Sequence, residues 1–350
     1  MSTAYYGLIE AVESCLRVVP RIKSKMPIKG TSATTSADYM NLAASMIGRS
    51  DSTGAGLAQV VQDTGHSNTF YKRVAALRHH CLTQFRAQSD RLPEALNEAA
   101  WTELASSFQR LLWQIEALVE LQDRRMTQPR QRRKSKRQAL PGLPSDWRID
   151  LFNRGSRGKY ALALLVSALT GARPHELVIG ADVWVAHDET LGKPVVCIHL
   201  PGAKVKADQG QPNRYVSYTL DDNDPLVTAL VQRVVDIADG RLQIRIAHGG
   251  NFTKETQRLA RDLWPKHPHA ITAYCFRHQW SADVKAQGGA DAVSRGLGHR
   301  SAKTRRHYGT ANQSKGGHCL RPVRIEADLP ITGLRSRHVP ATAEQFTPRP

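Results

Sequence analysis

A run of basic residues near the middle of the chain divides the sequence into two parts. Residues 124–137 carry eight Lys or Arg and no acidic residue, and a segment with that charge density cannot pack against itself. We therefore interpret residues 124–144 as an interdomain linker that becomes ordered on a polyanion. A nuclear-localisation signal is the alternative for the same run. The remaining sequence is then a region at 1–123, a domain at 145–325 and a tail at 326–350 that we expect to be flexible.

The first 123 residues have the apolar periodicity of helices. Residues 8–16, 70–81 and 104–115 place apolar side chains three or four positions apart, which is typical of helices that bury one face. Basic side chains project from other faces of the helix expected at 67–85. We assign Lys72, Arg73 and Arg78 to contacts with phosphate groups, and a solvated charged face is the alternative.

The second half combines helices with short strands. Residues 160–170 are strongly apolar, Gly171 can end that helix in the left-handed conformation, and Pro174 suits the first turn of the next helix. Residues 182–187, 194–200 and 214–220 are rich in β-branched and aromatic residues and are separated by turn-forming stretches. The sequence therefore predicts an α+β fold that is mainly α-helical with a small antiparallel β-sheet.

The charge of the chain favours a polyanionic partner. Lys and Arg total 49 against 31 Asp and Glu, so the formal net charge is +18. Double-stranded DNA is the simplest polyanion of this kind. The basic run supplies further expected DNA contacts, namely Arg132, Arg133, Lys134, Lys136 and Arg137.

Other sequence features indicate neither a membrane protein nor a metal site. The sequence has no run of 18 apolar residues and no signal pattern at its start, so we expect a cytoplasmic protein without membrane contacts. Its five cysteines are scattered without a Cys-x-x-Cys pair, and its histidines lack companion ligands. We therefore expect neither a metal nor a cofactor.

Four residues of the second half suit phosphodiester cleavage. Arg173 lies in TGARPHEL and Arg277 in AYCFRH, while His299 and Tyr308 are nine residues apart in LGHRSAKTRRHYG. Arginine binds two phosphate oxygens in parallel, histidine can donate to another oxygen, and a tyrosine hydroxyl can attack phosphorus. For Arg173 taken alone, a structural pair with Glu176 is the alternative.

A strand that leaves after cleavage also needs a proton on its 5′ oxygen. The turn between the second and third expected strands carries Lys204 and Lys206, and a lysine on such a hairpin can donate that proton. We favour Lys204 because it follows the strand end directly. Both lysines could instead be ordinary phosphate contacts or solvated turn residues.

These motifs resemble those of tyrosine recombinases of the phage integrase type. TGARPHEL is similar to the family's T-G-x-R-x-x-E-L, AYCFRH to H-x-L-R-H, and LGHRS to the L-G-H-x-S that precedes the tyrosine. The resemblance implies that Arg173 and Arg277 clamp the scissile phosphate and that His299 donates to a nonbridging oxygen. It also implies that Lys204 is the general acid and Tyr308 the nucleophile, with Glu176 as a supporting carboxylate.

One position departs from the family pattern. Tyr274 stands where the family has the first histidine of H-x-L-R-H. Its hydroxyl can hydrogen-bond to the phosphate or to Tyr308, but a phenol does not accept a proton at neutral pH as imidazole does. We keep Tyr274 among the expected catalytic residues, with His278 as the alternative base.

The resemblance also implies an activity and an assembly. We predict an integrase-type, site-specific DNA recombinase that cleaves and rejoins duplex DNA through a 3′-phosphotyrosine. Its biological task is phage or mobile-element DNA integration, transposon resolution or chromosome dimer resolution. The resemblance implies a helical core-binding domain before the catalytic domain, and a homotetramer on paired sites with the segment after Tyr308 docked on a neighbouring subunit or forming a disordered tail. When bound to DNA the protein would be associated with the nucleoid. A type IB topoisomerase and a noncatalytic DNA-binding accessory protein are the alternatives.

Overall fold

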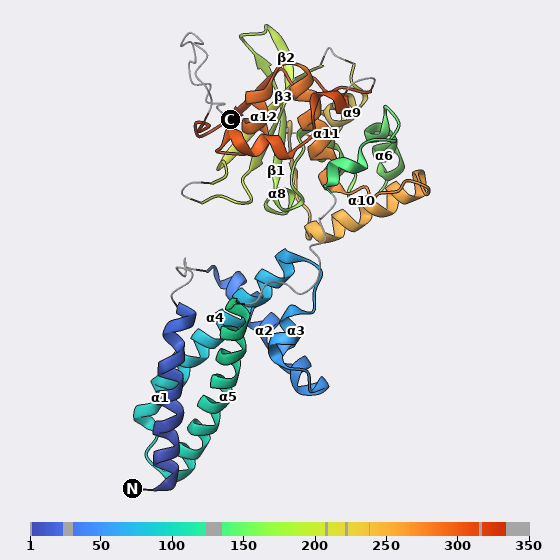
Figure 1. Ribbon diagram of the computed structural model, residues 1–350. Coiled ribbons are helices and arrows are strands. Elements are labelled where there is room, and N and C mark those ends of the chain that lie inside the picture. The colour runs from blue at the N-terminus through green and yellow to red at the C-terminus, as the bar shows by residue number, and fades with distance from the viewer. Residues whose placement is uncertain are drawn as a thin grey trace. The chain divides into compact units, whose positions relative to one another are not determined.

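The chain forms two compact units, each with its own hydrophobic core. The computed structural model describes residues 2–23, 31–123, 135–206, 209–220, 223–237, 239–314 and 317–333. The first unit spans Met1–Arg133 and the second Lys134–Pro350. Helices together with one five-stranded antiparallel sheet confirm the predicted α+β class (Figure 1).

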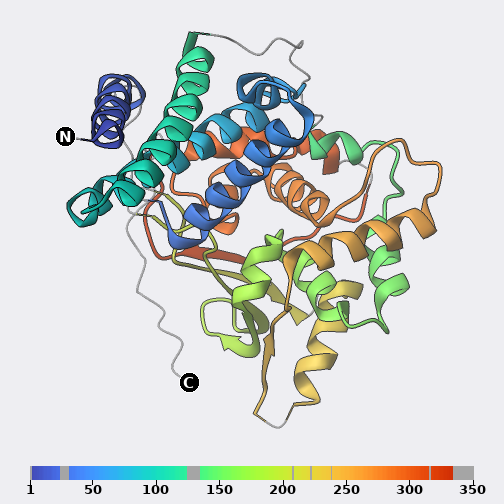
Figure 2. The same cartoon turned by 90° about the horizontal axis from the view of Figure 1, so that it is seen from below.

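The first unit is built from helices whose apolar faces meet. They are α1 (Thr3–Lys23), α2 (Ala33–Thr53), α3 (Leu57–Gln62), α4 (Ser67–Arg91) and α5 (Glu98–Asp123), with a short 3-10 turn at Leu92–Glu94. Helix α1 packs along α5, and α2 packs on α4 (Figures 1 and 2). Cys15, Leu77 and Phe108 are fully buried, as the periodicity predicts, whereas Leu16 is half exposed.

The second unit places most of its helices around one face of the sheet. Its longer helices are α6 (Trp147–Gly155), α7 (Ala161–Thr170), α8 (Pro174–Ile179), α9 (Pro225–Val235), α10 (Gly249–Leu263), α11 (Ala273–Ala286) and α12 (Ala290–Gly296). Short 3-10 helices are η2 (Lys136–Ala139), η4 (Ala302–His307) and η5 (Ala311–Ser314).

The sheet has the order β4-β1-β2-β3-β5, with every pair of neighbours antiparallel. Its strands are β1 (Ala181–Asp188), β2 (Lys193–Pro201), β3 (Asn213–Thr219), β4 (Arg241–Ile244) and β5 (Arg324–Ala327). The first three were predicted from the sequence, and β4 and β5 were not. Val183, Ile198 and Val216 alternate with outward-facing residues and share a core with α7 and α11.

The boundaries of the second unit differ from the predicted ones. Residues 135–144, which we interpreted as linker, belong to this unit because Ala139 and Leu140 are buried in its core. Residues 124–134 lie outside the described residues. The predicted tail begins too early, because β5 pairs with β3 and Thr332 bridges to Ser301. Residues 334–350 lie outside the described residues as well.

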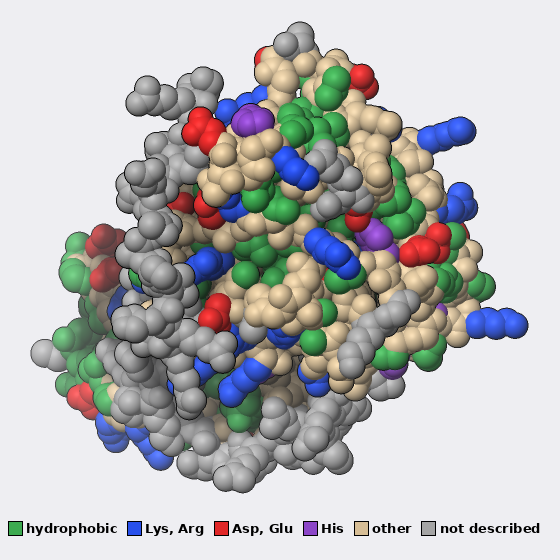
Figure 3. Space-filling view, turned by 90° about the horizontal axis from the view of Figure 1, so that it is seen from above, with side chains coloured by type: hydrophobic (Ala, Val, Ile, Leu, Met, Phe, Trp, Pro, Cys, Tyr) green, Lys and Arg blue, Asp and Glu red, His purple; other side chains and the backbone are tan. Residues whose placement is uncertain are grey.

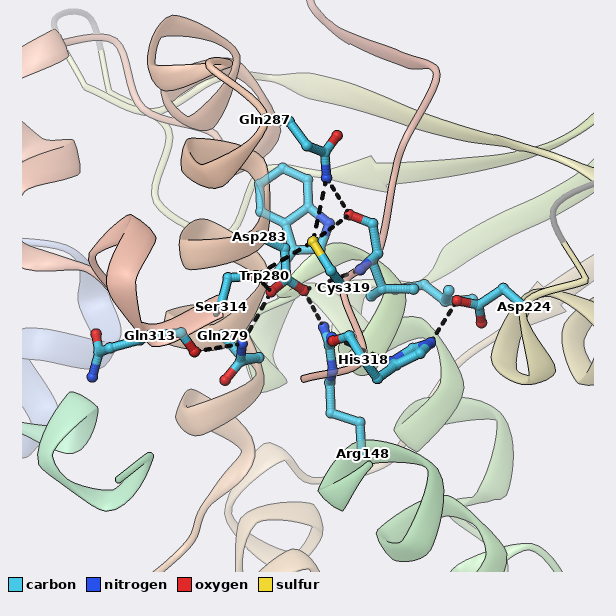
Figure 4. Close-up of polar contacts among 12 residues, drawn as sticks. Arg148, Asp224, Gln279, Trp280, Asp283, Gln287, Gln313, Ser314, His318 and Cys319 are labelled. Carbon is cyan, nitrogen blue, oxygen red and sulfur yellow. Dashed lines mark hydrogen bonds and ion pairs between the residues drawn. The ribbon is translucent and has the colours of Figure 1, made fainter. Parts of the chain in front are cut away.

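The segment after Tyr308, which we expected to dock on a neighbouring subunit or to form a disordered tail, packs on its own chain in the part that the structure describes. A buried network holds it there (Figure 4). Asp283 of α11 forms a 2.7 Å ion pair with Arg148 and accepts a 2.7 Å hydrogen bond from Ser314. His318 lies 2.6 Å from Asp224, and Leu320 is fully buried. Removing one partner of a buried ion pair leaves the other charge without compensation, which is strongly destabilising. The buried contacts therefore fix the path of the segment.

Candidate active site

The site begins at the sharp turn between α7 and α8. Gly171 ends α7 with φ 62°, and a Cβ at this position would lie 3.0 Å from the Arg277 Cα. Glycine is therefore required both for the left-handed conformation and for the close approach of α11. The turn places Arg173 directly before α8, where its side chain is 15% exposed.

Glu176 connects two arginines inside the protein. Its carboxylate is fully buried and accepts hydrogen bonds from the Arg173 backbone N–H (2.7 Å) and Nη1 (2.6 Å). The Nη2 of Arg214, on β3, donates to the same carboxylate at 2.7 Å. Burial disfavours ionisation, but the charges of Arg214, Arg277 and Arg173 outweigh it and lower the Glu176 pKa to about 2. The predicted support of Arg173 by Glu176 thus has a geometric basis.

Arg277 is completely buried in α11 and links three parts of the site. Its Nη1 donates to the Gly171 carbonyl at 2.9 Å, and its Nη2 donates to the Leu297 carbonyl and lies 3.1 Å from the His299 Nε2. Burial and the Arg173 charge lower the Arg277 pKa to about 10. Arg277 therefore stays charged at neutral pH.

His299 is held as a neutral imidazole. Because Arg277 can only donate, the His299 Nε2 accepts and the ring proton is on Nδ1. Burial together with the charges of Arg277, Arg173 and Arg214 lowers the His299 pKa to about 2. The buried Nδ1 has no hydrogen-bond partner within the described residues. This arrangement leaves one N–H donor for a ligand.

Tyr308 lies against these groups at the end of η4. The Arg277 guanidinium carbon is 5.0 Å from the centre of the Tyr308 ring, and the His299 ring centre is 5.1 Å away. Burial opposes ionisation of the half-buried phenol, but Arg277 and Arg173 outweigh it and lower the Tyr308 pKa. The structure thus brings together Arg173, Arg277, His299 and Tyr308, the four residues that the sequence pattern singled out.

Lys285 and Gly309 fix the main chain around Tyr308, and neither residue was predicted to belong to the site. The Lys285 Nζ donates to the carbonyl oxygens of Arg305 (3.0 Å), Tyr308 (3.4 Å) and Gly309 (2.5 Å). A Cβ on Gly309 would lie 2.1 Å from the His278 carbonyl oxygen. The segment that carries the phenol is therefore clamped from two sides.

A cleft beside the cluster contains the hairpin lysine. Arg173, His299 and Lys204 line a cavity of about 370 Å³, together with Gly202, Gln209, Gly298 and Ser301. Lys206 does not line this cavity, and its backbone pairs with Gln209. Lys204 is exposed and faces the same space as the first arginine. This placement favours Lys204 over Lys206.

The structure separates Tyr274 from the cluster and places His278 beside Tyr308. Tyr274 is 44% exposed at the start of α11, and within the described residues it makes neither a hydrogen bond nor a ring contact. The ring of His278 is instead 5.3 Å from the ring of Tyr308. Burial and the nearby Arg277, Arg137 and Lys285 lower the His278 pKa to about 4, so the imidazole is neutral at pH 7.

Arg214 could have been recognised from the strand pattern. It shares the inward face of β3 with Val216 and Tyr218, and each is at least 98% buried. An arginine at an inward position of a core strand needs a buried partner. The strand was predicted from its β-branched and aromatic residues, but the inward position of Arg214 was not predicted.

The expected DNA contacts of the first unit differ in their availability. Lys72 is exposed on α4. Arg73 donates to the carbonyls of Val60, Val61 and Asp63 at the end of α3, which gives it a structural role that we did not predict. Arg78 is half-buried, and its Nε has no partner within the described residues.

The expected contacts of the basic run are only partly described. Lys136 and Arg137 are exposed on η2, whereas Arg132, Arg133 and Lys134 lie outside the described residues. On the face seen in Figure 3, the Lys and Arg side chains stand singly among Asp and Glu. The positive charge of the chain is therefore not gathered on that face.

Among the residues with assigned positions, no three His, Cys, Asp or Glu side chains lie close enough together to hold a metal ion. No helix in that part of the chain is sufficiently long and apolar to cross a membrane.

Comparison with known proteins adds no assignment. No protein-family model matches the chain, and no curated protein or solved structure is significantly similar to it.

Proposed function

We propose that this protein is a site-specific DNA recombinase of the tyrosine type, which cleaves and rejoins duplex DNA through Tyr308. The observation that carries the proposal is the position of the Tyr308 phenol beside Arg173, Arg277 and a neutral His299. A phenol with a lowered pKa and two adjacent guanidiniums can act as a nucleophile toward a phosphodiester that those guanidiniums hold.

The cleavage step assigns one task to each residue. The Tyr308 oxygen attacks phosphorus and its proton passes to the neutral His278, whose ring lies beside it. The bond between phosphorus and the 5′ oxygen breaks, and Lys204 donates a proton to the leaving oxygen. Arg173, Arg277 and the His299 Nδ1–H bind the nonbridging oxygens, on which the negative charge grows.

Rejoining is the same step in reverse. A 5′ hydroxyl attacks phosphorus, gives its proton back to Lys204, and the Tyr308 oxygen leaves and recovers the proton from His278. The number of phosphate ester bonds is unchanged throughout. The exchange therefore needs no ATP and no external oxidant or reductant.

The charge of the chain supports duplex DNA as the partner. The net charge of +18 and the exposed Lys72, Lys136 and Arg137 suit binding to the phosphate backbone. We propose that the protein acts in the cytoplasm on nucleoid DNA and forms a homotetramer on paired sites.

A covalent trap tests the activity without knowledge of the target sequence. Purified protein is mixed with fragmented genomic DNA of its source that carries random nicks, because a short strand that leaves beside a nick cannot be rejoined. The reaction is stopped with detergent, and DNA bound to protein is isolated and sequenced. We expect recovered fragments that share one sequence, and their loss in Tyr308→Phe. Tyr215→Phe, on the outer face of β3, is the matched control that keeps the adduct.

The same preparation separates the two alternatives. Rapid relaxation of any supercoiled plasmid, without a shared target sequence, would indicate a type IB topoisomerase. Sequence-selective DNA binding without any adduct would indicate a noncatalytic accessory protein.

A further inference from the structure

The catalytic cluster contains a third arginine, which is buried like Arg277. Arg214 is 1% exposed and donates to the Glu176 carboxylate at 2.7 Å. A Cβ on Gly298 would lie 3.0 Å from the Arg214 Nη1 and 3.9 Å from the Arg173 Nη1. The absence of a side chain at Gly298 thus lets both guanidiniums lie directly behind the loop that carries His299.

The start of β3 is also tied to that loop. The Gln211 backbone N–H donates to the Gly298 carbonyl at 3.2 Å, and its side chain donates to the His299 carbonyl at 3.3 Å. Arg214 follows three residues later, at the second position of β3. It is therefore held in a defined place relative to His299, with its side chain buried.

The count of buried charges shows what Arg214 contributes. Arg173, Arg214 and Arg277 are positive, Glu176 is negative and His299 is neutral, so the cluster keeps two net positive charges. A phosphodiester under attack carries two negative charges on its nonbridging oxygens. Without Arg214, the Glu176 carboxylate would cancel half of the positive charge that faces them.

We infer that Arg214 is a positioning residue that neutralises Glu176, so that Arg173 and Arg277 present their full charge to the scissile phosphate. The inference rests on the proposed function for its substrate. Glu176 then fixes the orientation of Arg173 without reducing the field at Tyr308. Arg173 and Glu176 belong to one sequence motif, whereas Arg214, which offsets the Glu176 charge, comes from strand β3.

A purely structural role makes a different prediction. If Arg214 only anchors β3 to α8, its loss should be harmful whether or not Glu176 is charged. If Arg214 offsets the Glu176 charge, removing that charge as well should restore the site. The pair of substitutions Arg214→Gln and Glu176→Gln therefore distinguishes the two roles.

The first measurement is made without DNA. The ionisation of Tyr308 is followed by its phenolate absorbance, as the difference between each protein and the same protein carrying Tyr308→Phe. We expect Arg214→Gln to raise the Tyr308 pKa, Glu176→Gln to lower it, and the double variant to return it to the wild-type value. Equal values in all four proteins would overturn the inference.

The second measurement is the rate of adduct formation on the recovered DNA. We expect a loss of about a hundredfold in Arg214→Gln, most of which is recovered in the double variant. A double variant as slow as Arg214→Gln would overturn the inference. Arg324→Gln is the matched control, since this sheet arginine pairs with Asp188 outside the cluster and its loss should leave the rate unchanged.

Folding of the variants is checked by thermal unfolding. If Arg214→Gln does not fold, Glu176→Gln and Arg214→Lys decide the question. Arg214→Lys keeps the positive charge and should leave the Tyr308 pKa unchanged, whereas Glu176→Gln should lower the Tyr308 pKa. A changed Tyr308 pKa in Arg214→Lys, or an unchanged one in Glu176→Gln, contradicts the inference. Absence of any adduct in the wild-type protein would refute the proposed function, while the titrations without DNA would still decide the role of Arg214.

Discussion

The guanidinium carbon of Arg277 lies 5.0 Å from the centre of the Tyr308 ring. A buried cation in this position stabilises the phenolate and also faces any phosphate that the phenolate attacks. Arg277 in turn is held by the Gly171 and Leu297 carbonyls, at the ends of α7 and α12. The position of the proposed nucleophile is thus coupled to the core of the second unit.

The buried charge of Glu176 should make stability depend on pH. Its pKa falls from 4.5 to about 2 on folding, so its stabilising contribution is fully present above pH 4.5 and is lost as the pH falls toward 2. Urea unfolding should show that the free energy of unfolding falls between pH 6 and pH 3 in both proteins. The fall should be smaller by about 2 kcal/mol in Glu176→Gln than in the wild-type protein. An equal loss in both proteins would contradict the assigned ionisation.

Lys285 should affect the rate of cleavage more than the binding of DNA. Lys285→Met removes the donor to three carbonyls around Tyr308, and we expect adduct formation to slow by roughly tenfold to a hundredfold with an unchanged Kd for DNA. Lys285→Arg should recover part of the rate. Lys254→Met, at an exposed lysine of α10, is the control. A change in Kd alone would make Lys285 a DNA contact.

Lys204 can be tested by changing the leaving group. A substrate with sulfur in place of the bridging 5′ oxygen releases a thiolate, which needs no proton. Lys204→Ala should therefore cleave the oxygen substrate at least about a hundredfold more slowly than the wild-type protein does. It should cleave the sulfur substrate at the wild-type rate. Lys206→Ala should show no such difference. Rescue of Lys206→Ala instead would transfer the general acid role to that residue.

Asp283 should be a major determinant of the stability of the second unit. Its ion pair with Arg148 is buried, with 0% and 1% side-chain exposure (Figure 4). Asp283→Asn leaves a buried arginine without its counter-ion, and we expect a loss of about 3–5 kcal/mol in urea unfolding. Asp262→Asn, which breaks half-exposed pairs with Arg154 and Arg258, should cost less than about 1 kcal/mol. Similar losses in both variants would contradict the account of the network.

Local sequence signals predicted the parts of the fold that depend on neighbouring residues. The Gly171 cap, the start of α8 at Pro174 and the first three strands follow from periodicity and backbone preference. Strand β5 was missed because its pairing with β3 joins residues more than a hundred positions apart. The predicted linker, residues 124–144, was extended too far because Ala139 and Leu140 find their apolar partners only in the folded unit.

The residues of the candidate site also differ in whether a local sequence signal identifies them. Arg173, Arg277, His299 and Tyr308 occur in motifs and lie together in the structure. Arg214 has a distant carboxylate as its partner, and its only local signal is a charged residue at an inward position of a strand. Lys285 escaped prediction because its partners are main-chain carbonyls, which leave no local pattern. The choice between Tyr274 and His278 depends on how the loop after η4 meets α11, and spacing along one helix does not define that contact.

The most direct measurement of the central claim is the chemical identity of the protein–DNA bond. The trapped adduct is digested with protease and nuclease, and the modified peptide is sequenced by mass spectrometry, while the released strand is tested for direct labelling by a polynucleotide kinase. We expect a 3′-nucleotide on the oxygen of Tyr308 and a released strand with a free 5′ hydroxyl. Attachment to another residue, a released strand with a 5′ phosphate, or no adduct with any DNA fragment would contradict the claim.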